Sequence, residues 1–311
     1  MPQSLVLNLE TQSTVSSNHL QGYSLQQLFF NLVDVVDPDL GRVLRRDKKN
    51  CSYAVSAIQF SPNPSTIPAP ISASPITLTH RLQSSSQETS NTLQYAHTAT
   101  VEQHTKCWWR ISFLDDGLFD HLAYLWNQLS DEIFLLGPSG VKVESVAFES
   151  SVNAWASSCS YCDLYEQASA HERDIHLQFV TPTAFTNGAA VTPLPTADAV
   201  FQHLRKHWNR YSGLVFAPRL VEAVIPIDFD IQTQTVQTIR RNSLQNLTGC
   251  TGQISFRING HGDPFIVKRI NALANFTRYC GIGINTQLGM GVVKRLPAKQ
   301  TTLMNVNAFN A

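Results

Sequence analysis

Four glycines near the C-terminal end of the chain have a spacing that suits contact with phosphate. Gly281, Gly283, Gly289 and Gly291 give a GxGxxxxxGxG pattern within the segment GIGINTQLGMG. Glycine allows positive φ and close backbone approach, so amide N–H groups in such a loop can donate to phosphate oxygens. The spacing matches neither a dinucleotide-binding fingerprint nor a Walker loop. The alternative interpretation is a helix cap followed by a tight turn before a strand.

Basic residues are concentrated in the same part of the chain. The 311 residues carry no net formal charge, but residues 201–311 contain 13 Lys and Arg against 4 Asp and Glu, a net charge of +9. Residues 1–200 contain 10 against 19, a net charge of −9. The C-terminal part is therefore suited to a polyanion, and the alternative interpretation is ordinary variation of charge along the chain. The basic residues predicted to contact a polyanion such as RNA are Arg205, Lys206, Arg210, Arg240, Arg241, Lys268, Arg269, Arg278, Lys294 and Arg295.

Strands and helices are predicted to alternate in the N-terminal half of the chain. The predicted elements are a strand at 4–10, a helix with an apolar stripe over 25–33, a short helix capped by Asp37, strands at 52–60 and 106–114, a helix at 117–130 and a strand at 141–150. A further strand is expected at 76–82, within a stretch rich in Pro, Ser and Thr. The order β-α-β-β-α-β is the ferredoxin-like plan.

The C-terminal half repeats this plan. The predicted elements are a strand at 175–181, a helix at 196–211, strands at 220–231 and 234–239 or one long bent strand, a strand at 250–259, a helix at 263–281 and a strand at 291–296. Trp208 shares a helix face with Phe201 and Leu204, so we expect it in the core rather than on RNA. The sequence thus predicts an α+β fold of two tandem ferredoxin-like domains, residues 1–155 and 156–311.

A glycine-rich loop at the end of such a tandem chain resembles the RAMP superfamily, whose domains are RRM-like. Within it, the chain looks most like the CRISPR repeat-RNA processing endoribonuclease, the sixth Cas protein family. The segment NHLQGYSLQQLFFNLVDVVDPDLGRVLRR resembles that family's first helix pair, and VTPTAF resembles its mid-chain strand motif. The resemblance implies binding of a repeat RNA, cleavage of the pre-crRNA at the base of its hairpin, and retention of the product with other Cas subunits in a guide-RNA effector complex.

The chemistry that the resemblance implies is metal-independent. A ribose 2′-OH attacks the adjacent phosphorus and leaves a 2′,3′-cyclic phosphate and a 5′-OH, which requires a base, an acid and cations near the phosphorane. Much of the family has a histidine at the end of the second short helix, where this sequence has Arg45 followed by Arg46. A guanidinium stabilises negative charge but is no base near neutral pH.

The histidine closest to Arg45 in the sequence is His19, which lies in the segment SSNHLQGY just before the first helix. Histidine titrates near neutral pH, so His19 is a candidate acid or base, and the alternative is a surface or capping histidine. Lys48 would neutralise charge at the scissile phosphate, or simply lie in solvent at the helix end. Tyr23 would orient a phosphate, or pack. His19, Tyr23, Arg45, Arg46 and Lys48 are the predicted catalytic group.

The cysteine content and the N-terminal residues bear on three further questions: metal binding, disulfide bonding and cellular location. Cys159 and Cys162 form a CxxC pair, but no further ligands follow at a zinc-module spacing, so no metal and no small-molecule cofactor is predicted. Six cysteines are too few for a disulfide framework, and no export signal or membrane span is recognisable. These features predict a cytoplasmic protein.

Three functions remain open at this point. The first is an endoribonuclease that cuts CRISPR repeat RNA, and the second is a non-catalytic subunit that binds the 3′ hairpin of the crRNA. The third, a RAMP subunit that coats the guide, is disfavoured by the N-terminal helix pair.

Overall fold

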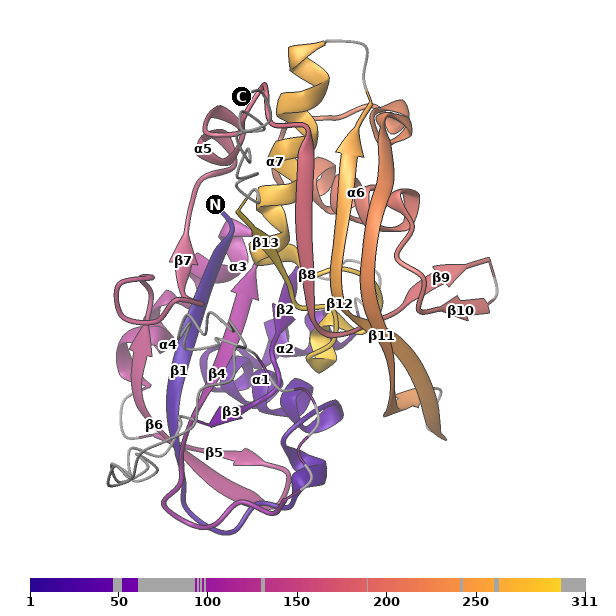
Figure 1. Cartoon of the computed structure of the whole chain (residues 1–311). Helices are drawn as coiled ribbons and strands as arrows, with labels where there is room; N and C mark the ends of the chain where they lie inside the picture. Colours follow the sequence, from indigo (N-terminus) through magenta and orange to yellow (C-terminus); the bar gives the residue numbers. More distant parts are fainter. Residues whose placement is uncertain are drawn as a thin grey trace, which may run out of the picture.

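The fold of the protein consists of two antiparallel sheets, each covered by helices (Figure 1). The computed structural model describes residues 1–46, 52–60, 93, 95, 97, 99–129, 132–188, 190–240, 243–259 and 263–297. The strand predicted at 76–82 and the candidates Lys48 and Arg241 lie outside these residues. Within the described residues, no helix is both long and apolar enough to cross a bilayer.

The N-terminal sheet has the strand order β2-β4-β1-β6-β5, with β3 on β4 and β7 on β1. Its strands are β1 (Gln3–Thr11), β2 (Tyr53–Val55), β3 (Gln59–Phe60), β4 (Lys106–Phe113), β5 (Ile133–Leu136), β6 (Ser139–Ala147) and β7 (Ser157–Ser158). The helices are η1 (Ser17–His19), α1 (Tyr23–Val36), α2 (Pro38–Arg46), α3 (Asp116–His121) and α4 (Ala123–Gln128).

The C-terminal sheet has the order β11-β12-β8-β13. Its strands are β8 (Asp174–Thr183), β11 (Val224–Arg240), β12 (Ser243–Ile258) and β13 (Val293–Leu296), with a separate hairpin of β9 (Phe185–Asn187) and β10 (Ala190–Thr192). The helices are α5 (Tyr161–Glu166), α6 (Ala197–Tyr211), η2 (Pro218–Ala223), α7 (Pro264–Cys280) and η3 (Thr286–Leu288). In both sheets the first strand of the βαββαβ unit lies between the third and fourth, so the prediction of two tandem ferredoxin-like domains is confirmed.

Apolar spacing explains the helix pair of the N-terminal half. Leu25, Leu28, Phe29, Leu32 and Val33 are all buried, which confirms the predicted stripe on α1. The next helix starts at once, because the carboxylate of the residue before Pro38 accepts hydrogen bonds from two amides of its first turn at 2.8 and 3.0 Å.

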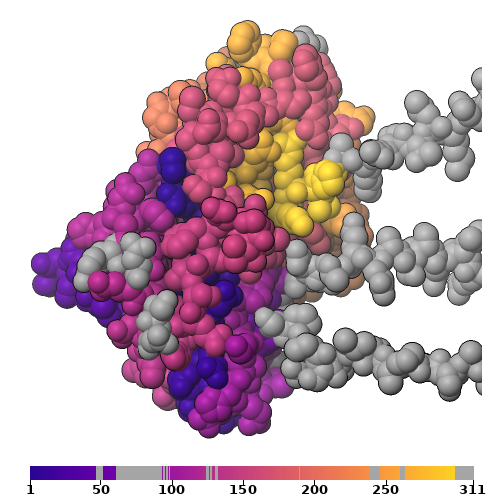
Figure 2. Space-filling view, turned by 90° about the vertical axis from the view of Figure 1, so that its left-hand side faces the viewer, coloured from indigo at the N-terminus to yellow at the C-terminus, as the bar shows by residue number. Residues whose placement is uncertain are grey.

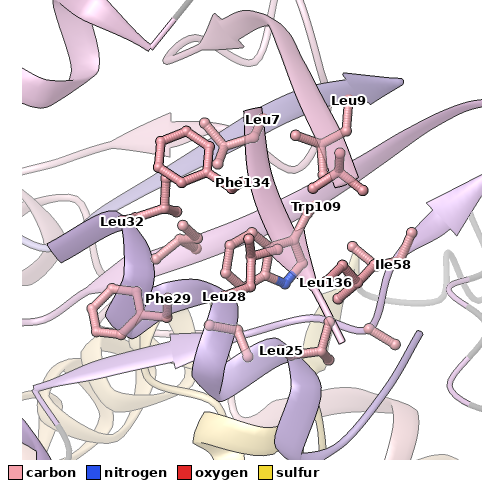
Figure 3. Close-up of a cluster of buried hydrophobic side chains, with 14 of the residues drawn as sticks. Leu7, Leu9, Leu25, Leu28, Phe29, Leu32, Ile58, Trp109, Phe134 and Leu136 are labelled. Atoms are coloured by element: carbon pink, nitrogen blue, oxygen red, sulfur yellow. The ribbon is translucent and has the colours of Figure 1, made fainter. Parts of the chain in front are cut away.

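The side chains of this stripe pack on the sheet in one apolar cluster (Figure 3). Trp109 of β4 is fully buried there, and its indole N–H donates to the carbonyl of Ser56 at 2.9 Å. The ring of Phe29 stacks on that of Tyr53 with the centroids 3.9 Å apart. The second cluster is built on α6 and α7, and Trp208 is fully buried in it, as predicted.

Several elements of the N-terminal half differ from the sequence-based expectation. The single strand expected at 52–60 is divided into β2 and β3, because the Ser56 hydroxyl, and not its carbonyl, accepts the hydrogen bond from the Arg110 amide of β4. The helix expected at 117–130 is divided at Leu122, whose N–H is shared among carbonyls of the preceding turn. Strand β5 was not expected, since the run Ile-Phe-Leu-Leu shows no alternation, although its side chains alternate between exposed and buried.

Candidate RNA-binding and cleavage site

His19 ends the 3₁₀ turn η1 and is partly buried beside the start of α1. Its Nδ1 lies 3.0 Å from the hydroxyl of Ser24, and no described residue forms a hydrogen bond with its Nε2. The imidazole packs on the turn between β5 and β6, where a Cβ added to Gly137 would lie 2.5 Å from the His19 Cγ. One ring nitrogen is thus fixed by the protein and the ring plane is held, as an acid–base group requires.

The side chain of Arg45 is bonded to other residues of the protein. Its guanidinium forms a two-pronged ion pair with Asp34 of α1, with Nη1 at 2.8 Å from Oδ1 and Nη2 bonded to Oδ2. It also lies over the ring of Phe30, 4.5 Å from the centroid. The hydrogen bond with Asp34 raises the pKa of the Arg45 guanidinium above its usual value. Tyr23 begins α1 and is 50% exposed, and Arg46 is exposed at the end of α2.

The glycine-rich loop is packed against the body of the protein. All four glycines have positive φ, and a Cβ at Gly283 or Gly291 would lie 2.4 or 2.1 Å from a backbone carbonyl oxygen. Within the loop, the amide of Ile282 donates to the carbonyl of Gly291 at 2.8 Å. The amide of Ile284 donates to the carbonyl of Ala184, which lies outside the loop, at 2.9 Å. Packing therefore requires these glycines, and contact of the loop with RNA stays a prediction.

The same loop touches the helix that follows His19. The side-chain amide of Gln26 donates to that of Gln287 at 3.3 Å. A Cβ at Gly289 would lie 3.0 Å from the amide nitrogen of Ala57 and 3.2 Å from a methyl group of Leu25. The first turns of α1 and the 3₁₀ turn η3 are thus in direct contact, which brings the His19 region of one domain beside the glycine loop of the other.

Some of the predicted RNA-binding side chains are exposed, and others are bonded to residues of the protein itself. Arg205 donates to Gln202 and the carbonyl of Phe216, Lys268 pairs with Glu166 at 2.7 Å, and Arg295 bonds to Glu172, Asn271 and Asn275. Those that remain exposed are Lys206, Arg210, Arg269, Arg278 and Lys294, although Arg278 also donates to the carbonyl of Ala154 at 2.8 Å. The side chain of Arg240 is outside the described part of the structure.

A cavity of about 640 Å³ gathers part of this set between the linker at 154–172, α7 and β13. Arg278, Lys294 and Arg295 line it together with Trp155 and Tyr279. Figure 2 shows the C-terminal residues, in yellow, lying beside the pink segment that includes this linker. The combination of cationic and aromatic side chains suits an RNA backbone and its bases.

Arg110 contributes to the domain junction and was not expected from the sequence. It is buried in β4 and donates to Ser4 at 2.8 Å, to the carbonyl of Trp155 at 3.2 Å and to the carbonyl of Arg278 at the end of α7. Burial, together with the nearby Arg278, lowers the pKa of Arg110 to about 9. Nothing in the sequence around a mid-strand arginine signals such a contact.

We expect Lys294→Ala to weaken RNA binding and to reduce the salt dependence of affinity. Each phosphate that the protein no longer neutralises reduces the slope of log K against log salt by about one. Binding of the repeat hairpin is measured over a series of salt concentrations. Lys268→Ala is the matched control, because Glu166 already neutralises that ammonium group. Equal slopes for wild type and Lys294→Ala would remove Lys294 from the interface.

Two ferredoxin-like domains that bring a glycine-rich loop against the first helix define a tandem RAMP-type protein. Family models agree with this fold: "CRISPR Cas6 N-terminal domain" matches residues 1–166, and "CRISPR-associated endoribonuclease Cas6" matches residues 177–293. The chain belongs to the Cas6 family of CRISPR-associated endoribonucleases. A comparison with the curated proteins finds no match.

Solved structures share the fold over nearly the whole chain. Thermus thermophilus Cas6 (TTHB231), in a product complex, is 21% identical with a TM-score of 0.70, and the alignment covers 95% of this chain and 100% of that chain. Cas6 (TTHA0078), also in a product complex, is 20% identical with a TM-score of 0.66, over 95% and 99% of the two chains. A RAMP protein binding different RNA substrates is 12% identical with a TM-score of 0.51, over 95% and 100%.

Proposed function

We propose that this protein binds the hairpin of a CRISPR repeat RNA and cuts the pre-crRNA at its base. The observation that carries the proposal is the contact between the start of α1 and the glycine loop, because it places a fixed imidazole beside the basic domain. The product and substrate-mimic complexes of structurally similar Cas6 proteins, and the similar RAMP protein that binds different RNA substrates, support the same substrate class. The product stays bound, as one component of a guide-RNA effector complex with other Cas subunits.

In the proposed reaction the ribose 2′-oxygen attacks the adjacent phosphorus. His19 accepts the 2′-OH proton through Nε2, the P–O5′ bond breaks, and the leaving 5′-oxygen takes a proton from water to become a hydroxyl. The imidazolium of His19 then returns its proton to the solvent. The products are a 2′,3′-cyclic phosphate and a 5′-OH end. No metal is needed in this scheme, because Arg46 and Lys48 supply cationic charge and Tyr23 orients the phosphate.

A second candidate function is favoured by the state of Arg45. Where much of the family has a histidine, this protein has a guanidinium that is already paired with Asp34. A chain that only binds the crRNA hairpin, or cuts it slowly, fits that arrangement.

One assay separates these two functions. The protein is incubated with its repeat hairpin in EDTA, and the 3′ ends of the products are examined for a cyclic phosphate. A hairpin with a single 2′-deoxy nucleotide before the scissile bond is the matched control, because it removes only the nucleophile. Cleavage of the first RNA and not of the second supports the proposed reaction. Tight binding without cleavage of either RNA would leave only the binding function.

We expect Arg45→Met to reduce cleavage by about 10²-fold if Arg45 stabilises the phosphorane, since removal of one donor to developing charge costs that much. Asp34→Asn is the matched control, because it breaks the same ion pair but keeps the guanidinium over Phe30. Both variants should lose about 1 kcal/mol of stability. Equal losses of cleavage in single-turnover assays would show that the pair only fixes α2 against α1.

A further inference from the structure

A cluster of side chains of metal-binding types contains none of the residues of the proposed cleavage site. His203 and His207 are one turn apart on α6, with ring centroids 4.5 Å apart. Cys280 is the last residue of α7, and its Sγ lies 3.8 Å from the His203 Nε2. One ligand atom from each of the three residues can be chosen so that all lie within 4.8 Å of one another.

We propose that His203, His207 and Cys280 bind one Zn²⁺ ion. Two imidazoles and a thiolate are a donor set that zinc prefers. Zinc bonds of about 2.0–2.3 Å place tetrahedral ligand atoms about 3.3–3.8 Å apart, so the observed 3.8 Å between sulfur and nitrogen requires little movement. The i, i+4 spacing of the histidines puts both rings on one side of α6.

The surroundings of the cluster favour an ion over simple packing. The Nδ1 of His207 is buried, and no described atom forms a hydrogen bond with it, which is costly for a polar group unless a ligand satisfies it.

The two histidines of the cluster line a small cavity. A space of about 190 Å³ lies beside the two histidines and is lined by Asp198, Lys206 and the loop residue Gly283. Lys206 carries a charge that opposes a cation, and Asp198 and the Cys280 thiolate offset it. A water molecule would complete the tetrahedron from this cavity.

The position of the cluster suggests what the ion would do. Cys280 directly precedes Gly281, so the ion would fasten α6 to the point where α7 ends and the glycine-rich loop begins. A metal bound there would hold the loop without touching the scissile phosphate. This role is separate from the metal-independent cleavage proposed above.

The test uses cobalt as a spectroscopic probe of the full chain. Protein freed of metal with a chelator is titrated with Co²⁺ and then with Zn²⁺. We expect one equivalent of Co²⁺ to give tetrahedral d–d bands and a thiolate-to-cobalt charge-transfer band, and Zn²⁺ to abolish both. Cys280→Ser should lose the charge-transfer band and bind Co²⁺ at least about 100-fold more weakly. The Cys159→Ser/Cys162→Ser double variant, which removes the sequence's CxxC pair, should keep the band.

Circular dichroism and the unfolding midpoint in EDTA establish that the variants are folded. If Cys280→Ser does not fold, His207→Gln is used in its place, and it should lose the tetrahedral bands. Wild type that binds no Co²⁺, or a band that disappears in the Cys159→Ser/Cys162→Ser variant, would overturn the proposed site. Cleavage of RNA in EDTA is measured separately, so failure of the metal site and failure of the nuclease function are distinguishable.

Discussion

His19→Ala is expected to reduce repeat-RNA cleavage by about 10²–10⁴-fold, the usual contribution of a positioned acid–base group. RNA affinity should stay near that of the wild type, because the predicted RNA-binding side chains belong to the other domain. Single-turnover cleavage and equilibrium binding of the same hairpin are measured side by side. The side chain is only partly buried, so loss of folding is not the expected cause of the defect.

His171→Ala is the matched control for this prediction, since His171 is exposed and lies outside the group around α1. Ser24→Ala tests the hydrogen bond that fixes the His19 Nδ1 at 3.0 Å. We expect it to reduce cleavage by a smaller factor than His19→Ala and to change the pH profile of the rate. Unchanged cleavage in His19→Ala would remove this histidine from the catalytic group.

Gly291→Ala is expected to lower the free energy of unfolding by about 2–5 kcal/mol. A left-handed backbone costs an L-residue about 1–2 kcal/mol, and overpacking adds about 1–3 kcal/mol. The second contribution applies here because an added Cβ would lie 2.1 Å from the carbonyl oxygen of Ile282. Denaturant unfolding of both proteins measures the difference.

The variant Gly213→Ala separates the cost of the left-handed backbone from the cost of overpacking. Gly213 has φ +72, close to the +71 of Gly291, but an added Cβ would meet nothing within 4 Å. This control should therefore lose only about 1–2 kcal/mol. Equal losses in the two variants would show that the contact with Ile282 does not constrain the loop. A Gly291→Ala protein of normal stability that binds RNA weakly would instead support the phosphate-binding interpretation.

Periodic and local signals made most of the fold predictable. The stripe from Leu25 to Val33, the Asp37 cap and the position of Pro264 each depend on neighbouring residues only, and each is found as expected. The division of the strand at 52–60 was not predictable, because it depends on Ser56 bonding to Arg110, which is distant in the sequence. Contacts of that kind leave no pattern in a single sequence.

The sequence by itself determined most of the elements, the order of the two domains, and the concentration of basic charge in the C-terminal part. Only the tertiary structure decided which of the candidate side chains bond to other residues of the protein. It paired Arg45 with Asp34, turned Arg295 inward to Glu172, and brought Cys280 to His203. The physical reason is that backbone conformation and periodicity depend on near neighbours, whereas an ion pair or a ligand cluster depends on how sheets and helices pack.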